Sequence, residues 1–320
     1  MNRFALIALA SCLMAAGLSP ARAGQIQMPG GVDFTRLTAL EREIKAQDEN
    51  QAKRMAENQK MAVYIDLLGI GKDTDSQLMF TRQARATEDS ADKVRDRFAG
   101  AIKQTDRFRV YNARNSQSGV EGETSIYVHG RILSAHQDML DRLGIRKAVT
   151  TVTISLEISD SKDGKVLRSK VITGVYGDDP GEGEPIPRGV SLQNPEVQNN
   201  LRNNYLKALD WALEIAASYI EKTYRPMGIV LAASDEGVTM YGGEAHGIHQ
   251  KDRFLVFRLK PIPGMRRDIG EKIPLAIMEC APDATSSSCV IVERRDKAVI
   301  QKDDLAVLTD ASLRLTPEGQ

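Results

Sequence analysis

Residues 149–176 constrain the fold of this chain most, because they read as two strands joined by a tight turn. Between Val152 and Ile158, apolar side chains occupy every second position, and Thr, Ser or Glu occupies the positions between them. This strict period of two is typical of a strand with one buried face. Asp163-Gly164 follows and apolar residues resume at Val166, which predicts a long β-hairpin over 151–176. A lone hairpin is marginally stable, so a sheet and a helix must cover its apolar face.

Two helices are predicted to supply that cover. In the first, residues 90–104, the side chains of Val94, Phe98 and Ile102 recur at helical spacing. The second begins at Asn194-Pro195-Glu196, which combines a capping Asn, a first-turn Pro and an acidic residue, and runs to about 223. Its apolar stripe consists of Val197, Leu201, Tyr205, Leu209, Ala212, Leu213, Ala216 and Ile220. We expect Trp211, the only tryptophan, to anchor this helix in the core or at its rim.

Three further strands are predicted in the same domain, over residues 61–68, 108–113 and 125–133. Gly69-Ile70-Gly71-Lys72 follows the first of them. A phosphate-binding loop needs four residues between its two glycines and a Ser or Thr after the Lys, and this segment has neither. We therefore interpret it as an ordinary turn.

After Arg225-Pro226 every predicted element is a short strand. Frequent turns between short strands favour a small all-β barrel or sandwich. The six strands cover residues 228–233, 238–241, 253–259, 273–279, 289–293 and 304–308. A faint repeat is also present, because Gln250-Lys251-Asp252 and Gln301-Lys302-Asp303 each precede an apolar strand.

The pattern Val152-x-Ile154-x-Leu156-x-Ile158-x-Asp160, followed by the Asp163–Leu167 turn, resembles the central hairpin of the curli-type (CsgG-like) periplasmic domain. Residues 94–110 and 125–132 fit the same order, so the resemblance spans roughly 61–223. It implies an α+β fold, with a mixed sheet and packed helices. One departure is a missing helix between 107–111 and 125–132. Residues 247–257 resemble a turn and strand of the C-terminal domain of flagellar assembly protein T, which implies an SH3-like barrel.

The first 23 residues read as a secretory signal peptide, with Arg3, an apolar run and an Ala21-Arg22-Ala23 cleavage site before Gly24. The apolar run is too short for a membrane span. Leu9-Ala10-Ser11-Cys12 has the shape of a lipobox, so an outer-membrane lipoprotein attached through Cys12 is the rival reading. Residues 24–60 are a tail and a helix that carries Phe34, Leu37, Leu40 and Ile44 on one face. That helix either packs on its own domain or contacts a neighbouring subunit.

Cleavage would leave two cysteines, Cys280 and Cys289. Secretion makes a disulfide the default, and their spacing is not that of a C-x-x-C redox pair. The predicted bridge staples a hairpin.

No residue is predicted to be catalytic, cofactor-binding or metal-binding. His246 and His249 form the only close histidine pair, in a predicted surface loop. The acidic run Asp178–Glu184 lacks the alternating spacing of a calcium loop and reads as a solvated loop. No nucleophile motif is present. The mature chain has a small net negative charge, which argues against nucleic acid as a partner.

The sequence therefore predicts a signal peptide (1–23), a tail and helix (24–60), a curli-type α/β domain (61–225), a small β-barrel (226–310) and a tail (311–320). The leading hypothesis is a non-enzymatic periplasmic scaffold, such as a ring accessory of a flagellar or other surface structure, with protein partners or copies of itself. One alternative is a periplasmic regulator that activates an envelope enzyme or transporter. A second is a curli-type secretion lipoprotein.

A curli-type pore is not expected. Its two membrane hairpins would correspond to residues 134–147 and 177–192, which hold many charges and several prolines. Neither segment has the alternating apolar residues of two membrane strands. No transmembrane segment is expected in the mature chain.

Overall fold

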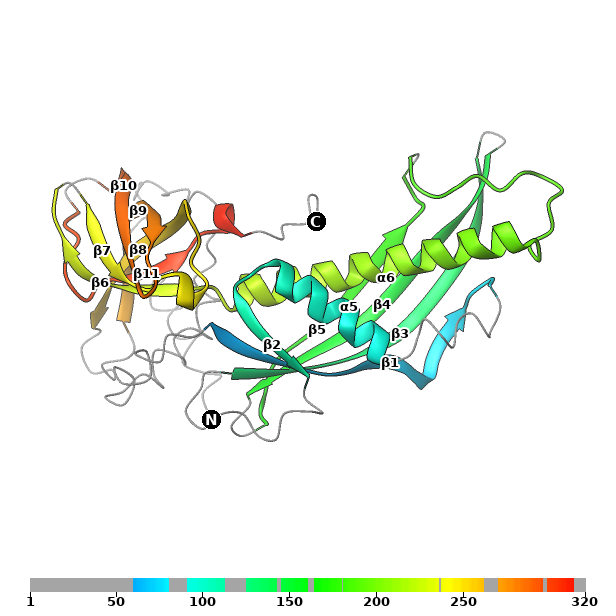
Figure 1. Ribbon diagram of the computed structural model, residues 1–320, viewed down its shortest axis with the longest axis horizontal. Helices are drawn as coiled ribbons and strands as arrows, with labels where there is room; N and C mark the ends of the chain where they lie inside the picture. The colour runs from blue at the N-terminus through cyan, green and yellow to red at the C-terminus, as the bar shows by residue number, and fades with distance from the viewer. Residues whose placement is uncertain are drawn as a thin grey trace, which may run out of the picture. The chain divides into compact units, whose positions relative to one another are not determined.

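The computed structural model describes residues 60–80, 91–112, 125–142, 145–160, 164–179, 181–235, 237–261, 270–295 and 298–313. These residues belong to one unit, 33–320, and form a five-stranded sheet with two helices and a closed six-stranded barrel (Figure 1). The α+β class with a small C-terminal barrel is confirmed. The signal peptide, Cys12 and the helix expected before residue 60 lie outside the described residues.

The sheet is mixed, with the strand order β2-β1-β3-β4-β5. Its central strand pairs are β1 with β3 and β3 with β4. β1 runs parallel to both β2 and β3, whereas the β3–β4 and β4–β5 pairs are antiparallel. The strands are β1 (Met61–Gln77), β2 (Phe108–Asn112), β3 (Ser125–Arg142), β4 (Ile145–Asp160) and β5 (Val166–Tyr176).

The β4–β5 pair is the hairpin that the alternating pattern predicts, and its register pairs Ile154 with Ile172. Every apolar side chain from Val152 to Ile158 is buried, while the intervening residues remain partly or fully exposed. Near the turn, the Asp160 carbonyl accepts a hydrogen bond from the Gly164 amide at 3.0 Å. Gly164 has a φ of +65°, which glycine adopts without a steric penalty.

Two expectations about strand length are wrong. Residues 69–72 do not form a turn, because β1 continues to Gln77 and absorbs the irregular segment in two register shifts against β3. The strand predicted over 125–133 is longer than expected, since the β3–β4 ladder extends to the pair Arg142 and Ile145. A polar residue is tolerated inside this extension where it finds partners. The buried Gln137 side chain donates to Thr150 Oγ1 at 3.0 Å and to the Leu201 carbonyl at 2.7 Å.

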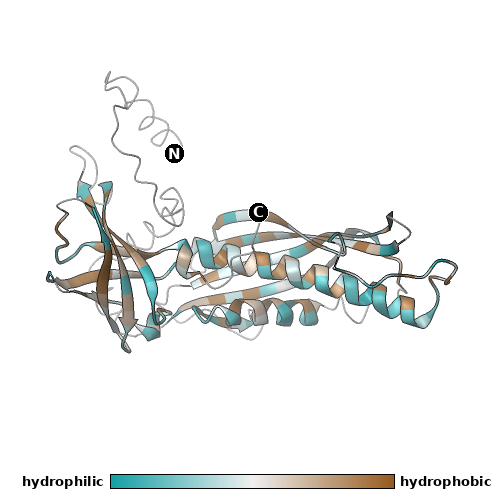
Figure 2. Cartoon of the chain, turned by 90° about the horizontal axis from the view of Figure 1, so that it is seen from above, coloured by the Kyte–Doolittle hydropathy of each residue, from teal (hydrophilic) through white to brown (hydrophobic). Residues whose placement is uncertain are grey.

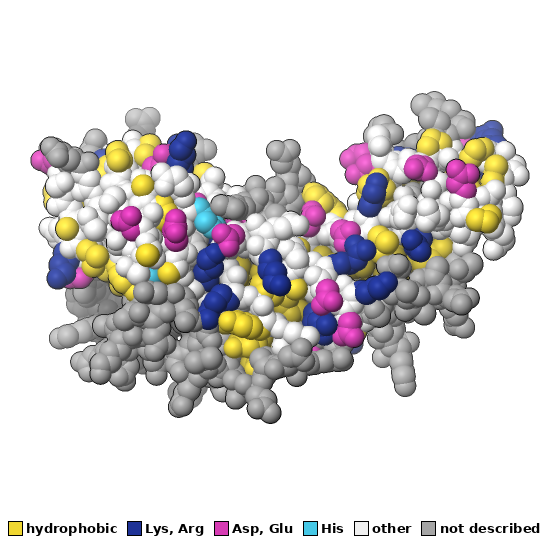
Figure 3. Space-filling model, viewed as in Figure 1, with side chains coloured by type: hydrophobic (Ala, Val, Ile, Leu, Met, Phe, Trp, Pro, Cys, Tyr) yellow, Lys and Arg dark blue, Asp and Glu magenta, His cyan; other side chains and the backbone are white. Residues whose placement is uncertain are grey.

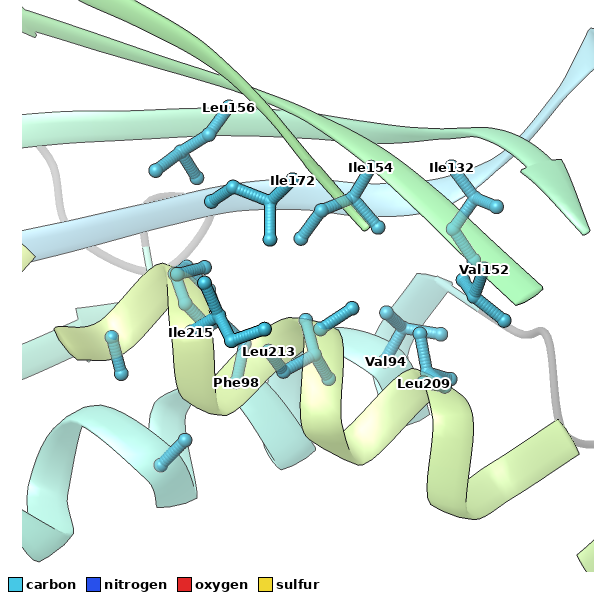
Figure 4. Close-up of a cluster of buried hydrophobic side chains, with 14 of the residues drawn as sticks. Val94, Phe98, Ile132, Val152, Ile154, Leu156, Ile172, Leu209, Leu213 and Ile215 are labelled. Carbon is cyan, nitrogen blue, oxygen red and sulfur yellow. The ribbon is translucent and has the colours of Figure 1, made fainter. Parts of the chain in front are cut away.

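Both helices cover the same face of the sheet. α5 (Ala91–Gln104) packs on β1 and β2, and α6 (Pro195–Thr223) packs on β4 and β5. All predicted stripe residues of both helices are buried. Figure 4 shows Val94, Leu209 and Leu213 from the helices pointing toward Val152 and Ile154 of the sheet. In Figure 2, brown and teal segments alternate along α6, as expected of an amphipathic helix.

The start of α6 is the predicted cap, because Asn194 Oδ1 accepts a hydrogen bond from the Glu196 amide at 2.9 Å and Pro195 is the first helical residue.

Gly174 of β5 lets the helix approach the sheet. A Cβ there would lie 2.2 Å from the Ala208 carbonyl oxygen. Of the two positions predicted for Trp211, the core is wrong and the rim holds, since 39% of its surface is exposed and it lies beside the buried stripe.

The barrel closes in the order β10-β7-β6-β11-β8-β9. Its core includes Val230, Met240, Phe254, Val256 and Met278. The strands are β6 (Met227–Ala233), β7 (Val238–Tyr241), β8 (Asp252–Pro261), β9 (Gly270–Pro282), β10 (Ser286–Arg294) and β11 (Leu305–Leu308). Short 3-10 turns η2 (Glu244–His246) and η3 (Asp310–Ser312) complete it. All six strands therefore match predicted ones.

A disulfide joins Cys280 of β9 to Cys289 of β10. The two residues are direct partners in the antiparallel ladder, and both are buried. The bridge therefore staples neighbouring strands inside the barrel core.

The sequence repeat before β8 and β11 is a real structural repeat, displaced by one residue. Asp252 Oδ2 accepts a hydrogen bond from the His249 amide at 2.8 Å, and Asp304 Oδ2 accepts one from the Gln301 amide at 2.7 Å. The residue before each Asp has a positive φ, +67° at Lys251 and +69° at Asp303. Asp252 thus corresponds to Asp304, not to the Asp303 of the sequence alignment.

Candidate functional site

A concave feature lined by apolar and charged side chains lies between α6, the end of β5 and the loop that follows β5. We call it the α6 groove. It has a volume of about 560 Å³. Its lining residues are Val175, Tyr176, Asp178, Asp179, Glu182, Lys207, Asp210, Trp211 and Glu214.

Four of these side chains come from α6, where Lys207, Asp210, Trp211 and Glu214 follow the spacing i, i+3, i+4 and i+7. Such positions share one face of a helix. This face lies beside the buried stripe, so folding of the stripe onto the sheet presents these four residues together. The spacing could have identified the face from sequence, but a search for an apolar stripe passes over it.

Two charged side chains of the groove, Lys207 and Asp210, have a close polar partner. Lys207 Nζ donates to the hydroxyl of Tyr176 at 2.7 Å and lies 4.7 Å from the centre of that ring. The Tyr176 hydrogen bond raises the pKa of Lys207. Arg97 of α5 holds Asp210, with 2.7 Å from Nη1 to each carboxylate oxygen. Figure 3 shows such basic and acidic side chains side by side over the face that carries α5 and α6.

Glu214 is the exception. Burial, together with the negative charge of Asp210, raises the pKa of Glu214. Within the described part of the chain, no basic side chain forms an ion pair with Glu214, Asp178 or Asp179. The groove therefore holds three carboxylates without a cation beside the ring of Trp211.

The acidic loop that borders the groove is mostly exposed in its described residues, as predicted, and its backbone is anchored to the sheet. The backbone carbonyls of Asp179 and Glu182 both accept hydrogen bonds from Lys147 Nζ on β4. Glu182 Oε2 also accepts a hydrogen bond from the Gly177 amide at 2.9 Å. The carboxylates of Asp178 and Asp179 remain exposed at the end of this anchored loop.

β5 adds a second feature to the same place, because it is an edge strand among the described strands. It pairs only with β4 on its inner side. Its side chains that point away from the helices include Val171 and Val175, which are 58% and 39% exposed. A long strand edge with exposed apolar side chains is a template for pairing with another chain.

A buried ionic cluster lies where β2, α6 and the barrel meet. Arg107 is almost fully buried and donates from Nε to Glu221 Oε1 at 2.8 Å. Its Nη1 donates to Asp252 Oδ2 and to the Gly247 carbonyl, at 2.8 and 2.7 Å. Its Nη2 donates to Asp252 Oδ1 at 3.1 Å and to the Ser312 carbonyl at 2.6 Å. We interpret this cluster as a structural joint, since every nitrogen of the guanidinium is occupied.

The expected histidine pair does not converge. His246 Nδ1 accepts a hydrogen bond from the Gly243 amide at 3.1 Å, whereas His249 faces Asp106, with 3.4 Å between Nε2 and Oδ2. Both lie in a loop with a short 3-10 turn between β7 and β8, as predicted, and their side chains are partly buried. Within the described ranges, no group of three or more His, Cys, Asp or Glu side chains is arranged to hold a metal ion.

Comparison with known proteins gives only distant similarities. No protein-family model matches the chain, and no curated protein matches it. A Xanthomonas campestris protein of the DUF330 family is 11% identical over 52% of this chain and 87% of its own, with a TM-score of 0.34. A PelC dodecamer from Paraburkholderia phytofirmans is 14% identical over 48% of this chain and 90% of its own, with a TM-score of 0.20. A minor lipoprotein from Acinetobacter baumannii is 10% identical over 51% of this chain and 91% of its own, with a TM-score of 0.25. Similarities this weak carry no argument about this chain.

Proposed function

We propose that the chain is a non-enzymatic scaffold protein of the bacterial envelope, which acts by binding other proteins. The observation that carries this proposal is the α6 groove beside the outer edge of β5, with which no described strand pairs. Exposed apolar side chains beside an unpaired strand edge are features of protein-binding surfaces. The groove also offers a solvent-accessible Trp211, and tryptophan is enriched at the energetic centres of interfaces.

Two further features support this role. The Cys280–Cys289 bridge suits an oxidising compartment, in line with the signal-peptide pattern at the start of the sequence. The Arg107 cluster joins the start of β2 and the end of α6 to the start of β8 in the barrel. Such a connection suits a scaffold protein, whose binding surfaces must be held in fixed positions.

More specifically, we propose that the protein forms a homo-oligomer or belongs to a ring, as an accessory of a flagellar or other surface structure. The order of the elements supports it, because a mixed sheet covered by helices precedes a small barrel, as the resemblances to the curli-type domain and to flagellar assembly protein T imply. Among the described helices, none combines the length and hydropathy needed to cross a membrane.

The test is crosslinking in intact cells followed by mass spectrometry of the proteins that purify with the chain. The proposal predicts defined envelope proteins, or further copies of this chain, recovered at near-stoichiometric amounts. Recovery of none above a mock purification would contradict it. So would a hydrolytic or transfer activity of the purified protein that disappears on mutation of a single residue.

A further inference from the structure

We propose that the free edge of β5 and the adjoining α6 groove bind an extended segment of a partner protein, by strand addition, with a lysine or arginine side chain of that segment seated in the groove. This inference deepens the proposed function and rests on it. It names the binding mode and the chemistry of the partner.

The backbone of β5 has one edge that no described strand pairs with. β5 spans eleven residues, and only its β4 side is paired within the described sheet. Such an edge presents a row of amide and carbonyl groups that an extended peptide can satisfy, while pockets for alternate side chains give specificity. The exposed Val171, Thr173 and Val175 occupy alternate positions on one face of this edge. Side chains of an added strand can therefore pack against them.

Lysine side chains often protect edge strands from pairing, and β5 contains Lys170. This lysine is held against the helix, because its Nζ lies 4.8 Å from the ring centre of Tyr219 on α6. Gly174, further along the strand, has no side chain. The stretch of β5 next to the groove is therefore unprotected.

The groove also carries an excess of acidic side chains. Lys207 donates to the Tyr176 hydroxyl and its charge interacts with Glu182 and Glu184, while Arg97 binds Asp210. Asp178, Asp179 and Glu214 have no ion-pair partner within the described residues. A cationic side chain entering here would be attracted to all three, and most to the partly desolvated Glu214, where solvent screens charge least.

An aromatic ring lies beside these acids. Trp211 lines the same groove and is solvent-accessible. An ammonium or guanidinium group over an indole face is stabilised by the ring quadrupole, and the indole gives the strongest such contact. Carboxylates beside an aromatic ring favour a cation with an aliphatic stem over a simple metal ion, because the stem can pack on the ring.

The sole tryptophan makes the site directly observable. In 15N-labelled protein, Trp211 gives a single indole NMR signal. The probe is the peptide Ac-Thr-Val-Arg-Val-Thr-NH2, and its matched control has Glu in place of Arg. We expect the Arg peptide to shift the indole signal saturably and to bind at least tenfold more tightly than the Glu peptide. Raising the salt concentration to 0.5 M should weaken the Arg peptide severalfold.

Two protein variants and two further ligands separate the contribution of charge from that of strand pairing. Glu214→Lys should lose the response, whereas Glu293→Lys, the same charge change on the exposed β10 strand of the barrel, should keep it. A peptide N-methylated at alternate amides keeps its charge but cannot complete a strand ladder, so it should bind at least tenfold more weakly. Spermine, a cation without a peptide backbone, should also bind more weakly than the Arg peptide.

Equal binding of the Arg and Glu peptides, undiminished binding of the N-methylated peptide, or a spermine response as tight as that of the Arg peptide would each overturn the inference. If crosslinking finds partners but the Arg peptide does not bind, the inference fails and the scaffold function stands. If crosslinking finds none, the scaffold function fails.

Discussion

Arg107 and Glu221 form an ion pair in which neither side chain has any exposed surface, with 2.8 Å between Nε and Oε1. Burying two charges is costly unless their remaining hydrogen-bonding groups are satisfied. The other two guanidinium nitrogens meet this condition, because they bind Asp252 and two backbone carbonyls. The cluster therefore stabilises the fold only when all its members are present.

Arg107→Ala should lower the free energy of unfolding by about 3–5 kcal/mol, because it leaves the Glu221 and Asp252 carboxylates buried without a cation. Denaturant titration followed by circular dichroism measures this change. Arg188→Ala is the matched control, since Arg188 pairs with Asp141 on the exposed surface and such a pair contributes at most about 1 kcal/mol. Equal losses from both variants would show that the cluster is not a structural joint.

Leu209→Asp should unfold the sheet and its helices, because the new carboxylate would lie in the fully buried face of α6 without a partner. The readout is thermal melting followed by far-ultraviolet circular dichroism. Asn203→Asp puts a carboxylate on an exposed position of the same helix and should melt within a degree or two of the wild type. A similar melting temperature for Leu209→Asp would disprove the burial of this face.

Gly174→Ala should destabilise the protein by roughly 1–3 kcal/mol, because the added methyl group would overlap the backbone of α6 at Ala208 and Ala212. Gly100→Ala on α5 should do the opposite. A Cβ at Gly100 meets nothing within 4 Å, and alanine favours a helix over glycine by about 1 kcal/mol. Chemical denaturation of the two variants side by side tests the sign of each change.

The double variant Cys280→Ser, Cys289→Ser should lose about 2–3 kcal/mol of stability, because the bridge restricts the unfolded chain. The loss should match the shift caused by a reductant on the wild type, and the double variant should not respond to reductant. Peptide mapping without reduction should recover the two cysteines in one linked species. Two free thiols in freshly purified protein would contradict the bridge.

Glu214→Gln should stabilise the protein at neutral pH. Burial and Asp210 raise the pKa of Glu214 above its ordinary value near 4.5, so the folded state binds this proton more tightly than the unfolded state does. The ionised carboxylate therefore destabilises the fold above its folded pKa. The advantage of the Gln variant should shrink as the pH falls through that pKa and vanish below 4.5. Melting temperatures of both proteins from pH 4 to pH 8 test this, and a constant difference would contradict it.

Local patterns predicted the elements whose residues depend mainly on their neighbours in sequence. The alternation from Val152 to Ile158 and the cap at Asn194 both reflect short-range geometry, and both are found in the structure. The turn expected at Gly69–Lys72 failed because pairing with β3 outweighs the local preference of glycine.

The buried ionic cluster and the position of Trp211 in the α6 groove were harder to predict, because the residues around them converge only in the folded protein. Arg107, Glu221 and Asp252 are far apart in the sequence, and each looks like an ordinary surface charge there. The position of Trp211 depends on which side of α6 meets the sheet. An apolar residue next to the stripe cannot be assigned to the core or the groove from spacing alone.

The barrel topology has a consequence for how the chain is made. β11 is the last described strand, yet it lies between β6 and β8 and pairs with both. The barrel therefore cannot close until residue 308 has left the ribosome. Until then β6 and β8 lack the strand that lies between them, and a ribosome that stops before Leu305 releases a product in which each of these two strands keeps one edge that no described strand pairs with.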